Sequence, residues 1–93
     1  MTKADIVKEI SKSTKIDKAN VLTVVEKLMW VIKDCMAHGE NVYLRGFGTF
    51  EIKTRAEKTA RNISKNTVVI VPEHKIPHFK PAPVFKEMVV KAE

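Results

Sequence analysis

Basic side chains gather in one stretch of this 93-residue chain. Between Lys53 and Lys65 there are five lysines and arginines, and Glu57 is the single acidic residue among them. Such a stripe of positive charge is typical of a surface that binds phosphate groups. The alternative is a solvated face of mixed sign, which the near absence of acids disfavours. The candidate contacts in this stretch are Lys53, Arg55, Lys58, Arg61, Asn62, Ile63 and Lys65.

Ile63 is a large apolar residue within the polar stretch 61–66. The runs on either side of it, 49–59 and 67–71, favour β-strands, and Pro72 ends the second run. Asn and Ser residues between such runs predict a turn, and therefore a β-ribbon with a polar tip at 61–66. A lone surface isoleucine is common. The basic surroundings favour the alternative, in which Ile63 is a wedge that enters between bases in a minor groove.

Charge is distributed unevenly over a chain whose formal net charge is +6. Residues 1–40 hold seven Lys and Arg against six Asp and Glu, whereas residues 41–93 hold ten against five. The hydrophobic content of 44% excludes a disordered tail. The length predicts a single domain, 1–93, that buries only a modest part of its surface.

The sequence gives little indication of catalysis or of metal or cofactor binding. The three histidines, His38, His74 and His78, have no metal-ligand spacing. No paired carboxylates, nucleophile elbow or glycine-rich phosphate loop is present, so we expect no catalytic residue, metal or cofactor, and not an enzyme. Cys35 is the only cysteine, which gives no sign of an oxidising compartment. With no signal peptide or membrane-length apolar run, we expect a cytoplasmic protein and no membrane partner.

Two helices are predicted in the first forty residues. Thr2 is a suitable N-cap for a first helix that ends near Thr14. Asp17 is a suitable N-cap for a second helix, which runs from Lys18 to about His38 and stops at Gly39. The second helix has a wide apolar face, which can pack on its own chain and on a partner chain at once. A homodimer is therefore favoured over a single-chain core. Trp30 points away from this face, as an exposed anchor or a partner contact.

The remaining elements are a short strand at 41–44, the ribbon at about 53–71 and a last helix opened by Pro81 and Pro83. The two glycines beside Phe47 predict a tight turn that needs positive φ or close backbone approach. The fold class is therefore α+β, with two N-terminal helices, a three-stranded antiparallel sheet that carries a long β-ribbon arm, and a short C-terminal helix. The predicted dimer core comprises Val25, Leu28, Ile32, Leu44, Phe47, Phe50 and Phe79.

Several motifs occur in a specific order over nearly the whole chain. They are Lys3, Arg45-Gly46-Phe47-Gly48-Thr49-Phe50, Arg55-Ala56, Ala60-Arg61-Asn62, and Ile76-Pro77 through Phe79-Lys80-Pro81. In this order the chain resembles the bacterial HU/IHF-type histone-like DNA-binding proteins. The resemblance implies an intertwined homodimer, or a heterodimer with a paralogue, in the nucleoid. It also implies a helical dimerisation base at 1–40, a saddle with DNA-binding arms at 41–80, and a closing helix at 81–93.

The resemblance assigns DNA contacts to the arm and to the body. Together with the basic stripe, the expected set is Lys3, Arg45, Gly46, Lys53, Arg55, Lys58, Arg61, Asn62, Ile63, Lys65, Lys75, Lys80 and Lys86. The chain departs from the family at the arm tip, where Ile63 replaces the usual proline, and at Ala60 and Asn66, where glycine is common. Pro83 stands where lysine is usual, and the second arm strand is more apolar than in the family.

The expected function is architectural, with bending and compaction of double-stranded DNA at little sequence specificity. Bent, gapped or junction DNA is expected to be favoured. A site-specific IHF-like subunit is the alternative, and the sequence does not separate the two. An RNA-binding or protein-interaction module is a further alternative, but the ribbon lacks the paired aromatics on which single-stranded bases stack.

Overall fold

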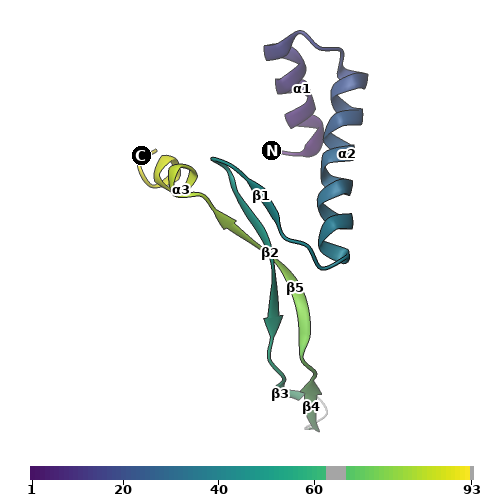
Figure 1. The fold of residues 1–93 in the computed structure, drawn as a ribbon, viewed down its shortest axis with the longest axis vertical. Helices are drawn as coiled ribbons and strands as arrows, with labels where there is room; N and C mark the ends of the chain where they lie inside the picture. The colour runs from purple at the N-terminus through teal and green to yellow at the C-terminus, as the bar shows by residue number, and fades with distance from the viewer. Residues whose placement is uncertain (63–66, 93) are drawn as a thin grey trace. The chain divides into compact units, whose positions relative to one another are not determined.

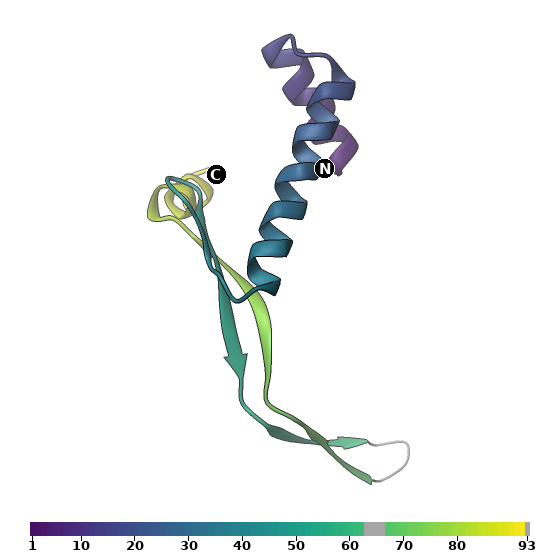
Figure 2. The same cartoon turned by 45° about the vertical axis from the view of Figure 1, so that its right-hand side comes forward.

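The computed structural model describes residues 1–62 and 67–92 (Figures 1 and 2). Ile63 and Lys65 lie outside the described residues, as does most of the predicted polar tip. The chain divides into two compact units, residues 1–35 and 36–93. Each unit is described by itself.

The first unit contains helix α1 (Lys3–Thr14) and most of helix α2 (Lys18–Ala37). A capping box begins α1, in which the Thr2 hydroxyl accepts the Asp5 N–H and the Asp5 carboxylate accepts the Thr2 N–H. The hydrogen bond from the Thr2 N–H, more than that from its hydroxyl, lowers the pKa of Asp5. The Asp17 carbonyl accepts the Val21 N–H, as expected of an N-cap. Both predicted helices are confirmed.

The second unit is built on antiparallel strands and ends in helix α3 (Pro83–Val90). Strands β1 (Val42–Leu44), β2 (Gly48–Arg55) and β5 (His74–Pro81) form a sheet in the order β1-β2-β5. Beyond it, β3 (Lys58–Asn62) and β4 (Thr67–Val71) form a separate two-stranded ribbon. We call the β2–β5 pair the inner ribbon and the β3–β4 pair the outer ribbon (Figure 2).

The prediction of one strand over 49–59 was wrong. Arg55 pairs with His74 and Lys58 with Val71, so residues 56–57 lie opposite residues 72–73 without ladder pairing. Pro72 has no N–H to donate, which explains an interruption at this point. Two boundaries also differ from the prediction. Residues 61–62 belong to β3 rather than to a turn, and Pro81 ends β5 rather than opening α3.

An aromatic cluster holds the second unit together. The Phe79 ring centroid lies 4.8 Å from that of Phe50, 5.3 Å from that of Phe47 and 6.1 Å from that of Phe85. Gly48 allows this packing, because a Cβ there would lie 2.6 Å from both the Lys80 carbonyl oxygen and the Phe79 ring. The two glycines predicted for the turn therefore have separate roles: Gly46 adopts a φ of +80°, and Gly48 provides the close approach.

Candidate nucleic-acid interface

The register of the inner ribbon sorts its side chains onto two faces. Paired residues across the ribbon share a face, and successive residues alternate between faces. Thr49 pairs with Lys80, Lys53 with Ile76, and Arg55 with His74. We call the resulting surface the basic face; it comprises Thr49, Glu51, Lys53, Arg55, His74, Ile76, His78 and Lys80.

The opposite face of the inner ribbon is mainly apolar. It carries Phe50 and Phe79 of the aromatic cluster, along with Ile52 and Pro77. The apolar face therefore packs within the chain, and the aromatic cluster leaves the basic face uncovered. Of the predicted contacts in this ribbon, Lys53, Arg55 and Lys80 share the basic face, whereas Lys75 pairs with Thr54 on the apolar face. All four are exposed.

Sequence reasoning missed two histidines of the basic face. From the sequence, His74 and His78 were considered only as possible metal ligands, whereas the register places both beside the cations. A ring nitrogen of His74 lies 3.0 Å from the Pro72 carbonyl oxygen. Their spacing of four residues puts both histidines on one face of a strand, but only the register with β2 shows that this face is the basic one.

Exposed carboxylates interrupt the basic stripe where the two ribbons meet. Glu57 follows the end of β2 and Glu73 precedes β5, so both lie in the unpaired segments between the ladders. A shallow hollow here is lined by Arg55, Ala56, Glu57, Lys58, Val71 and His74. These two carboxylates therefore separate the cations of the inner ribbon from Lys58 of the outer ribbon.

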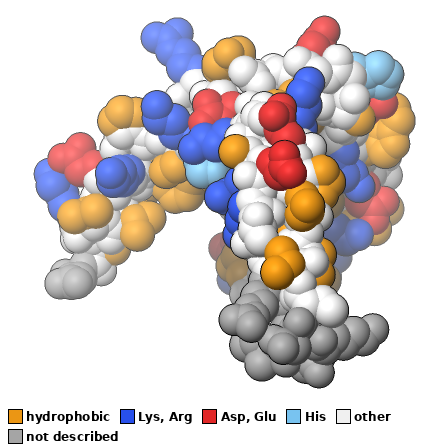
Figure 3. Space-filling model, turned by 90° about the horizontal axis from the view of Figure 1, so that it is seen from below, with side chains coloured by type: hydrophobic (Ala, Val, Ile, Leu, Met, Phe, Trp, Pro, Cys, Tyr) orange, Lys and Arg blue, Asp and Glu red, His pale blue; other side chains and the backbone are white. Residues whose placement is uncertain are grey.

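The outer ribbon exposes hydrophobic side chains instead. Val68 is 66% exposed, Val69 46% and Ile70 62%. In a view from below, hydrophobic side chains are visible at the surface among the basic ones (Figure 3). Lys58 is exposed at the start of this ribbon and pairs with Val71. The backbone of residues 61 and 62 pairs with that of Val68 and Thr67.

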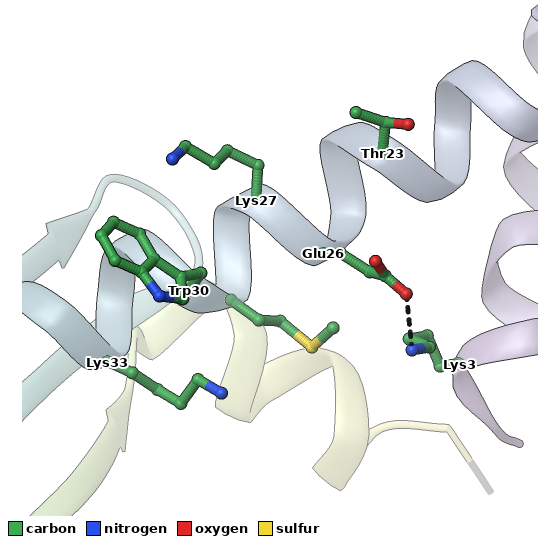
Figure 4. Close-up of a pocket in the computed structure, with 7 residues that line it drawn as sticks. Lys3, Thr23, Glu26, Lys27, Trp30 and Lys33 are labelled. Carbon is green, nitrogen blue, oxygen red and sulfur yellow. Dashed lines mark hydrogen bonds and ion pairs between the residues drawn. The ribbon is translucent and has the colours of Figure 1, made fainter.

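Further predicted contacts lie outside the two ribbons. Arg45, Gly46 and Lys80 line a common groove, so the β1–β2 turn and the end of β5 present their charges together. Lys86 is exposed on α3. In the first unit, Lys3 Nζ lies 2.9 Å from Glu26 Oε1, and this half-exposed ion pair holds the lysine against α2 (Figure 4).

Trp30 of the first unit is exposed beside lysines. The ammonium of Lys27 lies 4.4 Å from the centroid of the Trp30 ring, a favourable cation–π geometry (Figure 4). A surface groove is lined by Lys3, Thr23, Glu26, Lys27, Met29, Trp30 and Lys33. The prediction that Trp30 points away from the apolar face of α2 agrees with this position.

The predicted dimer core is only partly covered in one chain. Val7 and Val21 are the only hydrophobic residues that are buried within the described ranges. Leu28 and Phe47 are exposed, and the other predicted core residues are half-buried: Val25, Ile32, Leu44, Phe50 and Phe79. In the described residues, no helix is long and apolar enough to cross a membrane, and no three His, Cys, Asp or Glu side chains are grouped to hold a metal.

Comparisons with known proteins give matches over nearly the whole chain. The DNA-binding protein HU of Thermus thermophilus is 33% identical, over 98% of this chain and 94% of its own length. Integration host factor subunit beta of Marinobacter nauticus is 34% identical, over 96% of this chain and 92% of its own. An Anabaena HU–DNA cocrystal structure matches with a TM-score of 0.93 and 26% identity, over 98% of this chain and 99% of that one.

A family model gives the same assignment. The model described as bacterial DNA-binding protein matches residues 1–90, which include every described helix and strand. The resemblance stated from the sequence is thereby confirmed, and so is the predicted combination of helices and antiparallel sheet. The chain belongs to the bacterial DNA-binding protein family.

Proposed function

We propose that this protein binds double-stranded DNA as an architectural protein that bends the duplex with little sequence preference. The basic face of the inner ribbon carries the proposal. It places Lys53, Arg55 and Lys80 on the face of β2–β5 that the aromatic cluster leaves free. The HU neighbour of similar fold was crystallised with DNA, which supports the same ligand for this chain.

Affinity in this proposal comes mainly from phosphate contacts. Each lysine or arginine that neutralises a phosphate releases condensed counterions, so binding weakens steeply with salt. Side chains that approach from the minor groove read little beyond A·T against G·C, which accounts for low sequence specificity. Bending costs a few kcal/mol for each unstacked step and is offset by the additional surface that the bent DNA contacts.

The proposal includes a dimer, because one chain leaves more surface uncovered than a compact monomer of its size does. The chain exposes 8099 Å². A folded monomer of 10.6 kDa exposes only about 5,500 Å² by the usual scaling. The difference is of the size that obligate dimers bury on each partner. A homodimer is the simplest assembly, and a heterodimer with a paralogue would cover the same surface.

The predicted contacts outside the basic face remain part of the proposal. Arg45, Gly46 and Lys86 would meet the flanking DNA, as would Lys3 once it exchanges Glu26 for a phosphate. Along the arm, the proposed contacts are Lys58, Arg61, Asn62, Lys65 and Lys75, with Ile63 as the intercalating wedge. The base at 1–40, saddle and arms at 41–80 and closing helix at 81–93 would form one domain. Its location would be the nucleoid.

The experiment that tests the proposal is a titration of labelled nucleic acids at several salt concentrations. Duplex DNA, gapped DNA, a four-way junction and duplex RNA are compared, and dyes at the two ends of a short duplex report bending. We expect salt-dependent binding to DNA, tightest on gapped or junction DNA, with energy transfer that rises on binding. Binding without any change in end-to-end distance would contradict the architectural role, and a folded monomer in sedimentation would contradict the dimer.

A further inference from the structure

Two imidazoles lie on the basic face of the inner ribbon. His74 and His78 belong to β5 and flank Ile76, which pairs with Lys53 of β2. His74 is exposed and His78 is half-buried. Imidazole is the side chain whose charge ordinarily changes between pH 5 and pH 8. The formal net charge of +6 counts both rings as neutral, so protonation of either ring adds positive charge to the basic face.

The hydrogen bond of His74 determines what its ring offers to a ligand. Its Nδ1 lies 3.0 Å from the Pro72 carbonyl oxygen. Because a carbonyl oxygen only accepts, Nδ1 carries the proton, and Nε2 of the neutral ring is an acceptor. A phosphate oxygen is also an acceptor, so it gains a hydrogen bond from Nε2 only when the ring is protonated. A phosphate contact through Nε2 of His74 therefore requires the imidazolium.

Fixed charges of both signs surround the two rings in the free protein. The charged neighbours of His74 are Arg55 opposite, Lys53 diagonally opposite, and Glu57, Lys58 and Glu73 where the two ribbons meet. The charged and titratable neighbours of His78 are Glu51 opposite, Lys53 diagonally opposite, Lys80 on the same face of β5, and Tyr43 of β1, which pairs with Thr49. A phosphate of bound DNA adds a negative charge beside either ring, and an added negative charge favours the imidazolium.

We propose that His74 and His78 each gain a proton from solvent when DNA binds to the basic face, so that pH controls the affinity of this protein for DNA. The inference rests on the proposed function and adds two contacts and a regulation to it. Hydrogen bonds from a charged donor to a phosphate are shorter and stronger than neutral ones. By linkage, a group that takes up a proton on binding makes the affinity rise as the pH falls.

The test measures the affinity for one short DNA duplex at pH 8 and at pH 6, with the ionic strength held constant. We expect the wild-type protein to bind at least about tenfold more tightly at pH 6, because one hydrogen bond from a charged donor contributes roughly a factor of ten. Calorimetry in two buffers of different ionisation enthalpy counts the protons. At pH 7 we expect uptake of at least about one proton for each duplex bound.

Variants with a fixed charge separate protonation from any structural role of the rings. His74→Gln with His78→Gln keeps both positions neutral, and should bind at both pH values within about threefold of the wild-type protein at pH 8. His74→Lys with His78→Lys keeps both positions charged, and should bind at both pH values within about threefold of the wild-type protein at pH 6. Thermal unfolding at each pH checks that the variants are folded.

The remaining histidine provides the matched control. His38 follows α2 and lies outside the inner ribbon, so His38→Gln should keep the full pH dependence. The two rings of the basic face should also differ. His74→Gln should reduce the pH dependence more than His78→Gln, because the carboxylate of Glu51 lies opposite His78 and competes with the phosphate for that ring. If the glutamine pair is unfolded, these single variants and the lysine pair carry the test.

Three results would overturn the inference. They are a wild-type affinity that is equal at pH 8 and pH 6, a pH dependence that the folded glutamine pair retains, and a lysine pair that binds no more tightly at pH 8 than the glutamine pair does. The last result would mean that the two positions do not meet phosphates. Failure of the proposed function looks different, because the wild-type protein would then not bind the duplex at either pH.

Discussion

The inner and outer ribbons have the same antiparallel pairing but different surroundings. On the inner ribbon, one face packs into the aromatic cluster around Phe79 and the other face is polar and basic. On the outer ribbon, neither face packs closely against the rest of the described chain, and Val68 and Ile70 are exposed. The inner ribbon is therefore stabilised by its own chain. The outer ribbon has no comparable packing within the described chain.

The largest expected difference between the ribbons is in hydrogen exchange. In the free protein, amides of β4 should exchange with little protection, because an isolated two-stranded hairpin is marginal in water. Amides at the centre of β5 should open only with global unfolding, at a free energy higher by on the order of 5 kcal/mol. Exchange followed by NMR on the free protein measures both. Equal protection of Val69 and Phe79 would mean that the outer ribbon is already covered without DNA.

A substitution in the aromatic cluster tests the same difference in packing between the inner and outer ribbons. Phe79→Ala should lower the free energy of unfolding by about 3 kcal/mol, the lower end for phenylalanine because the side chain is half-buried. Ile70→Ala, on the exposed outer ribbon, should change it by less than about 0.5 kcal/mol. Urea unfolding at a fixed protein concentration gives both values. A similar loss for both variants would show that the two ribbons share one core.

The two glycines beside Phe47 are required for different reasons, one for close packing and the other for a positive φ. Gly48→Ala should destabilise the protein by about 2 kcal/mol, because its Cβ would meet the Lys80 carbonyl oxygen and the Phe79 ring. Gly46→Ala should cost about 1 kcal/mol, because only its positive φ is unfavourable for alanine. Asparagine is the control, since it tolerates this φ. Thermal unfolding should show a partial rescue by asparagine at position 46 and none at 48.

The smallest expected effect tests the two faces of the inner ribbon. Lys53→Ala should remove one phosphate contact per chain and reduce the slope of log affinity against log salt by about 1.8 for a dimer. Lys75→Ala removes the same charge from the opposite face and should change the slope less. Titrations of one duplex at several salt concentrations measure the difference. Equal changes would mean that DNA contacts the edge of the ribbon rather than one face.

Much of the fold could be predicted because its signals are local. Thr2, Asp17 and Gly39 mark helix ends by side-chain and backbone preferences that operate within one turn. Pro72 ends β4 because it lacks an N–H, whatever surrounds it. The basic stripe was also visible in the sequence, since charge depends only on residue type. These features need no knowledge of what packs against them.

The tertiary structure decided the features that depend on pairing between distant residues. Because of the register between β2 and β5, Lys53 and Lys80 share one face of the inner ribbon, whereas Lys75 lies on the other. A shift of this register by one residue would have exchanged the faces of the β5 side chains. Gly48 requires its lack of a side chain because Phe79 and Lys80 approach it from another strand. Likewise, β4 is exposed on both faces because nothing else in the described chain packs closely on β3 and β4. No local sequence pattern specifies this lack of packing partners.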